Sequence, residues 1–154
     1  MRIVVVGGTG LIGSRLVEVL REAGQDAVPA SPSTGVDTLT GAGVAEALTG
    51  ADVVVDVSNG PSFEPAAIEE FFTTSSRTLL AAEREAGVGH HVVLSIVGTD
   101  RLPESGYLHA KHVQEQLVEA SGVPYTIVRA TQFFEFLGAI ADGSTQDGAV
   151  LLPT

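Results

Sequence analysis

The chain has 154 residues, of which 44% are hydrophobic and 18% charged, which excludes a disordered protein and predicts one domain over 1–154 with a buried core. Its net charge of −11 repels phosphate backbones and no basic cluster offsets it, so we expect no binding to nucleic acid. The lack of cysteine excludes disulfides and cysteine-based metal sites, and the lack of a long apolar run excludes membrane binding, so we expect a cytoplasmic protein.

A glycine-rich turn joins the first predicted strand to the first predicted helix. Residues 2–6 form an apolar run typical of a buried strand, and 11–23 carry apolar residues at helical spacing before Gly24 ends the helix. Such a turn excludes side chains, its N–H groups can approach a pyrophosphate, and the positive end of the helix dipole attracts it. The predicted dinucleotide-binding residues are Gly7, Gly8, Thr9, Gly10, Leu11, Ile12 and Gly13, which satisfy both GxxGxxG and GxGxxG.

The second strand and the loop after it bear on the choice between NAD and NADP. Residues 26–30 predict a strand that Pro29 places at an edge. In a dinucleotide-binding fold the following loop meets the adenosine ribose, where a carboxylate selects NAD and a basic residue NADP. This loop has neither. The hydroxyl groups of Ser31, Ser33 and Thr34 favour NADP(H) slightly, as donors to a 2′-phosphate, against a loop that does not discriminate.

The next part of the chain contains an irregular segment, a short helix and a strand. Residues 36–39 follow the second strand too closely for a crossover helix, so they predict a very short strand or an extended loop beside the adenine. Asp37 is either an acceptor for the adenine amino group or a solvated turn carboxylate. After a short helix over 43–48, residues 52–57 are typical of a central strand buried on both faces. Beyond this strand, the predicted contacts of the nicotinamide ribose are Val57, Ser58 and Asn59.

A long helix over 63–86 and a strand over 90–97 follow. Apolar side chains of the helix recur on one face and are expected in the core. The strand begins with His90 and His91, which point to opposite faces and so do not chelate one ion; we expect no metal site. The core residues predicted from the helix are Phe71, Phe72, Leu79 and Leu80.

Three residues form the candidate catalytic group. Ser95 ends a strand, and Tyr107 and Lys111 stand four residues apart on a helix predicted over 105–121, so they share one helical face. An ammonium about 4 Å from the phenol is worth at most roughly 4 kcal/mol, which predicts a lowered pKa for Tyr107. Ser95 is expected to hydrogen-bond the substrate oxygen, and Lys111 to donate to the nicotinamide ribose as well. The alternative is an exposed helix pair without a catalytic role.

These motifs resemble the short-chain dehydrogenase/reductase superfamily, within it the atypical NmrA-like or NAD(P)H-binding branch. The likeness lies in GGTGLIG (7–13), DVSNG (56–60), LSIVGTD (94–100), YLHAK (107–111) and PYTIVRATQFFEF (124–136). It implies an α/β three-layer Rossmann fold, with a parallel sheet of five to six strands, helices on both faces and an NAD(P) cofactor. It also implies Tyr107 as acid/base, Lys111 as its partner and Ser95 as the substrate-oxygen ligand. Members are usually longer, so the C-terminal substrate lobe is expected to be missing or minimal.

The last part of the chain is expected to complete the sheet and the pocket. Residues 125–130 are interpreted as a last central strand, and 132–140 as an aromatic helix or loop that roofs the nicotinamide pocket. Its phenylalanines at 133, 134 and 136 are slightly favoured as core residues. A polar loop over 142–148 precedes 149–152, an apolar strand without a partner that invites a homodimer, unless the chain is a fragment.

Two functions from different classes fit these patterns. The first is an NAD(P)-dependent oxidoreductase that moves hydride to or from a carbonyl, quinone or sugar-type small molecule. The second is a non-catalytic sensor that reports the NAD(P)H ratio to a protein partner. Both functions need the glycine turn, and only the first needs Tyr107 and Lys111.

Overall fold

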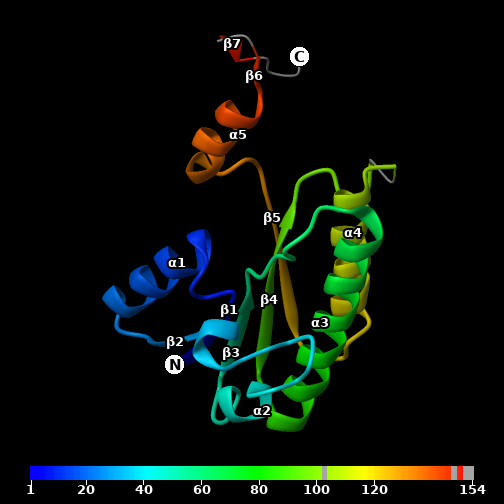
Figure 1. Cartoon of the computed structure of the whole chain (residues 1–154). Coiled ribbons are helices and arrows are strands. Elements are labelled where there is room, and N and C mark those ends of the chain that lie inside the picture. The colour runs from blue at the N-terminus through cyan, green and yellow to red at the C-terminus, as the bar shows by residue number, and fades with distance from the viewer. Residues whose placement is uncertain (102–103, 147–148, 151–154) are drawn as a thin grey trace.

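A five-stranded parallel sheet forms the centre of the computed structural model, which describes residues 1–101, 104–146 and 149–150. Its strand order is β2-β1-β3-β4-β5, and every pairing is parallel (Figure 1). The sheet confirms the Rossmann-type α/β fold that the sequence predicts. The strands are β1 (Arg2–Val6), β2 (Asp26–Ala30), β3 (Val53–Asp56), β4 (His90–Ile96) and β5 (Tyr125–Ala130).

Helices cover both faces of this sheet. α1 (Leu11–Glu22) lies on one face, and α3 (Pro65–Ala86) and α4 (Gly106–Glu119) pack together on the other (Figure 1). The short elements η1 (Pro32–Thr34) and α2 (Val44–Ala47) lie between β2 and β3 along the chain. Among the described residues, no helix is long and apolar enough to cross a membrane.

The core has one layer on each side of the sheet. Strand alternation sends Ile3 and Val5 of β1 to the cluster beneath α1, and Val4 and Val6 to the cluster beneath α2 and α3. On α3, Phe72 is fully buried and Leu79 and Leu80 nearly so, while Phe71 packs half-buried against the same interface. The apolar face predicted for the long helix is therefore confirmed, although the helix begins at Pro65 rather than at residue 63.

A buried polar pair fastens α3 to β4. His91 Nδ1 lies 2.8 Å from Glu83 Oε1, and both side chains are at most 2% exposed. Burial raises the pKa of Glu83, and the contact with His91 opposes that rise. His90 points the other way and lies 2.8 Å from the hydroxyl of Thr126. The two histidines thus lie on opposite faces, as strand alternation predicts.

One strand prediction differs from the structure, and the choice left open between a short strand and a loop is decided. Residues 125–130 form an edge strand rather than a central one, because β5 pairs only with β4. Val128 is accordingly 44% exposed. Residues 36–39 form a turn and not a strand, with the Asp37 carboxylate accepting from the backbone N–H of Leu39 at 2.8 Å. This hydrogen bond and the one from the Thr40 hydroxyl lower the pKa of Asp37, and a contact with the adenine stays a prediction.

The segment after β5 extends beyond the carboxyl ends of the strands (Figure 1). It contains η2 (Phe134–Phe136), α5 (Leu137–Gly143), β6 (Thr145–Gln146) and β7 (Ala149–Val150). Phe134 is 85% exposed, so the interpretation of this aromatic cluster as core is wrong. The prediction of an unpartnered last strand is also wrong, because β7 pairs with β6 in an antiparallel hairpin. The remaining residues of that predicted strand, Leu151 and Leu152, lie outside the described part of the chain.

Candidate functional site

The turn between β1 and α1 needs glycine for its own packing. A Cβ atom at Gly8 would lie 2.6 Å from the backbone of β1, and one at Gly13 would overlap the carbonyl group of Gly7. Gly7 has φ of +78°, and a Cβ atom there would lie 2.9 Å from the loop after β3. At Gly10 the nearest atom would be a carbonyl oxygen 3.2 Å away. Of these four glycines, Gly10 has the mildest steric conflict, because the Gly7 carbonyl would have to shift by only a few tenths of an ångström, and it is the N-cap of α1.

The first turn of α1 presents its backbone N–H groups without a side-chain cap among the described residues. Gly10 is the N-cap, and the first turn holds no acidic residue. The N–H groups of Leu11, Ile12 and Gly13 stand at the positive end of the helix dipole, where they attract an anion. The turn thus fits the diphosphate of a dinucleotide.

Three hydroxyl groups gather beside this turn, where β2 ends. Thr9 Oγ1 lies 2.8 Å from Ser31 Oγ and 3.2 Å from Ser33 Oγ, and the two serine hydroxyls are 3.0 Å apart. The hydroxyl of Thr34 instead donates to the carbonyl oxygen of Ser31 and accepts from its N–H, both at 2.9 Å. Thr34 therefore caps η1. The hydroxyl groups of Thr9, Ser31 and Ser33 form a separate cluster beside the glycine turn.

A cavity of about 730 Å³ lies at the carboxyl ends of the strands. It brings together the predicted cofactor segments at Ile12 and at 57–59, the predicted catalytic residues, and the segment after β5. The aromatic segment expected to roof the pocket thus lies in its wall. The lining residues used below are Ser95, Val97, Tyr107, Lys111, Ala130, Thr131, Gln132, Phe63, Phe133 and Phe136.

Tyr107 faces the loop after β3. Its hydroxyl donates to Asn59 Oδ1 at 3.2 Å, and its ring packs against Phe63 and Phe72, with centroids 5.5 and 6.1 Å apart. Burial raises the pKa of Tyr107, and the hydrogen bond to Asn59 opposes the rise. The expected lowering of this pKa is therefore wrong for this arrangement, because the Lys111 ammonium is engaged elsewhere.

Lys111 is buried rather than exposed. Its side chain is 5% exposed, and Nζ donates to the carbonyl oxygen of Leu94 at 2.7 Å and to Gln114 Oε1. The ammonium also lies 4.4 Å from the centroid of the Phe72 ring. Burial lowers the pKa of Lys111 to about 8, opposed by the carboxylates of Asp56 and Glu115. The alternative of an exposed helix pair is excluded.

A buried polar chain supports this lysine. Gln114 Nε2 donates to Asp56 Oδ2 at 3.0 Å, and Asp56 Oδ1 accepts from the N–H of Ser58 at 2.9 Å. The chain therefore links Lys111 to the loop predicted to bind the nicotinamide ribose. Sequence reasoning missed both supporting residues, although a carboxylate within the apolar run of β3 was a signal for Asp56.

Ser95 lies on the face of the sheet that α4, the helix of Tyr107 and Lys111, also covers. On β4 it lies on the same face as His91 and Val93, which face α3 and α4, and it pairs in register with Arg129. Its hydroxyl is buried on the side of Glu115 and makes no hydrogen bond within the described part of the chain. The residue contributes to the cavity wall, but its hydroxyl is directed to the opposite side of the sheet from α1. A role on the substrate oxygen stays a prediction.

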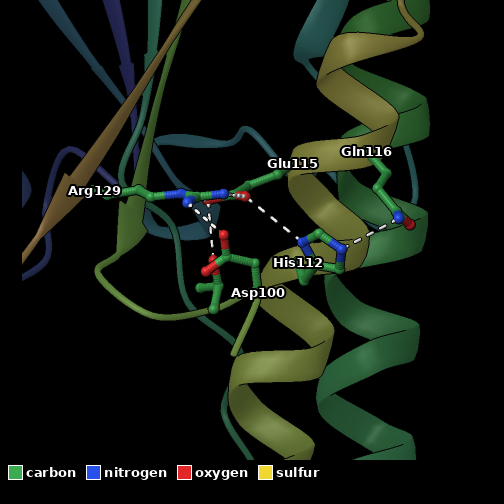
Figure 2. A network of polar contacts seen from close by, with 6 residues as sticks. Asp100, His112, Glu115, Gln116 and Arg129 are labelled. Atoms are coloured by element: carbon green, nitrogen blue, oxygen red, sulfur yellow. Dashed lines mark hydrogen bonds and ion pairs between the residues drawn. The ribbon is translucent and has the colours of Figure 1, made fainter. Parts of the chain in front are cut away.

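A second polar group, which the sequence reasoning missed, lies where α4 meets β5. Glu115 accepts from Arg129 Nε at 3.0 Å and from Arg129 Nη2 at 2.7 Å. Arg129 also donates to Asp100 Oδ2 at 3.2 Å, and His112 Nδ1 lies 3.7 Å from the Glu115 carboxylate. Figure 2 shows Arg129 and Asp100 on one side of Glu115, with His112 and Gln116 on the other. An arginine within the apolar run of β5 was the available signal.

The family model described as NAD(P)H-binding matches residues 7–136, which span the glycine turn, both loops of the cavity and the pair on α4. The chain belongs to this NAD(P)H-binding family. The resemblance read from the motifs is thereby confirmed.

Relatives of this NAD(P)H-binding chain include enzymes and assembly factors. It is 30% identical to the (4-alkanoyl-5-oxo-2,5-dihydrofuran-3-yl)methyl phosphate reductase of Streptomyces griseus, covering 96% of this chain and 54% of that protein. It is 24% identical to the photosystem II assembly factor Ycf39 of Synechocystis, covering 89% of this chain and 46% of that protein. The chain spans about half the length of the curated relatives it matches.

Solved structures show the same fold. The triphenylmethane reductase of Citrobacter sp., complexed with NADP(H), superimposes with a TM-score of 0.70 at 20% identity, over 94% of this chain and 56% of that one. The UDP-glucose 4-epimerase of Thermus thermophilus, complexed with NAD, gives 0.72 at 23% identity, over 84% and 54%. The chain thus shares the fold of NAD(P)-binding Rossmann proteins.

Proposed function

We propose that this chain binds NADP(H) at the glycine turn and reduces an uncharged carbonyl or quinone-type acceptor. The observation that carries this proposal is that one cavity is lined both by Ile12 and the loop 57–59, and by Tyr107 and Lys111. When bound, the cofactor supplies a hydride from its nicotinamide ring. The chain's own residues then have to bind the dinucleotide, orient the acceptor and supply a proton.

The hydroxyl cluster supports NADP(H) over NAD(H). Thr9, Ser31 and Ser33 lie within 3.2 Å of one another at the end of β2, where the adenosine ribose is expected. Together they can donate to a 2′-phosphate, and an acidic residue does not occur among residues 31–35. Ser33→Asp is expected to weaken NADPH binding at least tenfold and to leave NADH binding within about twofold, with Ser33→Ala as the uncharged control. Equal losses for both cofactors would refute the preference.

Tyr107 is the proposed proton donor. Its raised pKa keeps the phenol protonated at neutral pH, which suits a donor in the direction of reduction. With a carbonyl acceptor, hydride would add to the carbonyl carbon as the C=O π bond breaks, and the phenolic proton of Tyr107 would move to the resulting oxyanion. With a quinone, the hydride and the same proton would together give the hydroquinone. The products are the alcohol or hydroquinone, the oxidised cofactor and a tyrosinate that takes a proton from solvent. Lys111 would stabilise the tyrosinate once its side chain turns from Gln114.

The lining of the cavity favours an uncharged, planar acceptor over a sugar nucleotide. Phe63, Phe133 and Phe136 supply aromatic surface. Of the lining residues that the structure describes, Lys111 is the one that carries a charge, and its Nζ already donates to Leu94 and Gln114. A phosphate-bearing substrate would therefore meet no free basic group in this part of the wall, whereas a quinone or aromatic carbonyl would be covered by apolar atoms.

Two substitutions test the cofactor and the proton donor separately. Gly10→Ala requires only a small shift of the Gly7 carbonyl and adds a methyl group at the N-cap of α1, so we expect a loss of less than about 1 kcal/mol in stability and at least a tenfold loss of NADPH affinity by fluorescence titration. Tyr107→Phe is expected to keep NADPH affinity and to lose turnover in a screen of quinones and aromatic carbonyls, by roughly a hundredfold or more. Turnover that survives Tyr107→Phe would refute the assigned donor.

A second function, a cofactor-binding factor that acts on a protein partner, is favoured by one observation. The Tyr107 hydroxyl and the Lys111 ammonium have separate partners, so the pair is not assembled as an acid/base couple. The two assembly factors among the relatives are consistent with this alternative. It predicts NADPH binding without turnover on any acceptor, and cofactor-dependent capture of a partner that Tyr107→Phe leaves unchanged.

A further inference from the structure

The pair Glu115–Arg129 joins the helix of the proposed acid/base residues to two other walls of the cavity. Glu115 stands one helical turn beyond Lys111 on α4. Arg129 immediately precedes Ala130, with which β5 enters the cavity wall, and it also binds Asp100 in the loop after β4 (Figure 2). One carboxylate thus connects α4, the end of β5 and the end of β4.

The contact has the geometry of a fixed bridge. Arg129 approaches the Glu115 carboxylate with two nitrogens, at 3.0 and 2.7 Å, and this planar fork holds both partners in one orientation. Thr99 Oγ1 adds a third donor at 3.4 Å. The Glu115 side chain is 2% exposed, so water does not compete freely for it. Although burial alone would raise the pKa of Glu115, the hydrogen bonds from Arg129 and its neighbours bring it below the ordinary value.

We propose that Glu115 and Arg129 are a positioning pair. They hold α4, and with it Tyr107 and Lys111, in a fixed position relative to the loops 97–101 and 130–133. The catalytic consequence rests on the proposed reductase function, whereas the positioning itself does not. Neither residue is among those that line the cavity. They therefore act through the segments they join rather than by touching the acceptor.

Loss of this bridge is expected to change the relative positions of the segments that line the cavity. Without it, α4 is held to β3 through Gln114 and Asp56, and to β4 by the bond from Lys111 to Leu94. Gln114 stands next to Glu115 and Lys111 one turn before it, and neither of these two contacts reaches β5. Strand β5 meets α4 otherwise through the apolar cluster of Val118 and Ile127. Loss of the bridge therefore removes the polar tie that the Glu115 carboxylate makes between α4 and the end of β5. A displacement of about 1 Å at a reacting group is enough to cost roughly a hundredfold in rate.

The test uses charge-removing variants with a matched control. Glu115→Gln and Arg129→Gln each break the ion pair, Arg129→Lys keeps the charge without the fork, and Glu119→Gln changes an exposed carboxylate one turn further on α4. We expect the first two to lower kcat tenfold to a hundredfold with KM for NADPH unchanged within about twofold. The double variant should lose no more than either single one, because both remove the same bridge. Glu119→Gln should match the unchanged protein.

Two readouts do not depend on turnover. Lys111 is the chain's single lysine, so selective labelling gives one side-chain resonance. The charged groups that act on its ammonium are Asp56 from β3 and Glu115 from α4, and both support the charged form. Glu115→Gln should therefore lower the pKa of Lys111. Hydrogen exchange should also quicken at 97–101 and 130–133 in both charge-removing variants and stay unchanged in β1.

The outcomes separate this inference from the proposed function. If the unchanged protein shows no turnover, the reductase proposal fails, and the exchange and lysine titration still decide whether the pair positions α4. If both charge-removing variants keep kcat and leave exchange at the two loops unchanged, the positioning pair is refuted. If the losses in the double variant multiply, Glu115 and Arg129 act separately, which also overturns it. A variant that fails to fold is replaced by Arg129→Lys, for which an intermediate loss is expected.

Discussion

The buried ammonium of Lys111 makes the stability of this protein depend on pH in a defined window. Burial lowers its pKa from the ordinary 10.5 to about 8, so at about 1.4 kcal/mol per pH unit the charge costs the folded state about 3 kcal/mol. The folded state bears this full cost well below pH 8, where the lysine is charged in both the folded and the unfolded chain. Between pH 8 and 10.5 the unfolded chain binds more protons than the folded one, so the free energy of unfolding rises with pH.

Lys111→Met isolates this contribution. Methionine keeps the apolar stem against Phe72 and removes the titrating group. From pH 7 to pH 10, the free energy of unfolding of the unchanged protein should rise by about 2.5 kcal/mol relative to that of the variant. Urea unfolding at the two pH values measures it. The hydrogen bonds to Leu94 and Gln114 that the variant also loses affect the absolute stability, but cancel in the pH difference.

A direct titration checks the same quantity. The resonance of the single lysine should have its midpoint near the pKa of about 8 given by burial. A midpoint at its ordinary 10.5, or a stability difference between the two proteins that stays constant from pH 7 to pH 10, would refute the burial of Lys111. The polar chain from Asp56 through Gln114 would then have to be rejected as well, since it depends on that burial.

Three further substitutions test the packing. Gly13→Ala should lower the free energy of unfolding in urea by about 1–3 kcal/mol, because its Cβ atom would overlap the backbone of Gly7. Gly10→Ala, as the control, should lower it by less than about 1 kcal/mol, and equal losses would contradict the turn geometry. Glu83→Ala should cost about 3 kcal/mol or more in thermal unfolding by leaving a buried histidine unpaired, against less than about 0.5 kcal/mol for the exposed Glu85→Ala. Phe134→Ser should change the unfolding free energy by less than about 0.5 kcal/mol, since the ring is 85% exposed, and a larger loss would mean that it packs in the core.

The parts of this structure that the sequence predicted are those set by local rules. The bounds of β1 and β5 and the position of the glycine turn follow from apolar runs and from glycine spacing within a few residues. The edge position of β2 also follows locally. Pro29 has no backbone N–H to donate to a neighbouring strand, which favours a place at the edge of the sheet. The bounds of α1, α3 and α4 were right to within two residues, because a glycine or proline stands at or near their ends, whereas α5 begins five residues later and ends three residues later than the segment predicted over 132–140.

The parts that could not be predicted depend on contacts distant in sequence. Whether β5 is central or at an edge depends on how many strands pair with it, which its own residues do not encode. The direction of the Ser95 side chain depends on which face of β4 packs on α4. The surroundings of Lys111 depend on Gln114 and on Asp56, which lies 55 residues before the lysine. Spacing placed Tyr107 and Lys111 on one helical face, but packing against Asn59 and Leu94 decided their hydrogen bonds.

The charges around the cavity lead to a last prediction, on salt. Lys111 lies with Asp56 and Glu115, and Arg129 with Glu115 and Asp100, so on the α4 side the cations are compensated by acids. The attraction for a diphosphate then comes from short-range N–H groups and the dipole of α1, while the net charge of −11 repels a dinucleotide at long range. Raising ionic strength screens the long-range part first, with a Debye length of about 10 Å at 0.1 M. NADPH should therefore bind more tightly at 200 mM than at 20 mM salt. Weaker binding at high salt would instead indicate that a basic side chain, such as the exposed Arg15 on α1, pairs with a phosphate group.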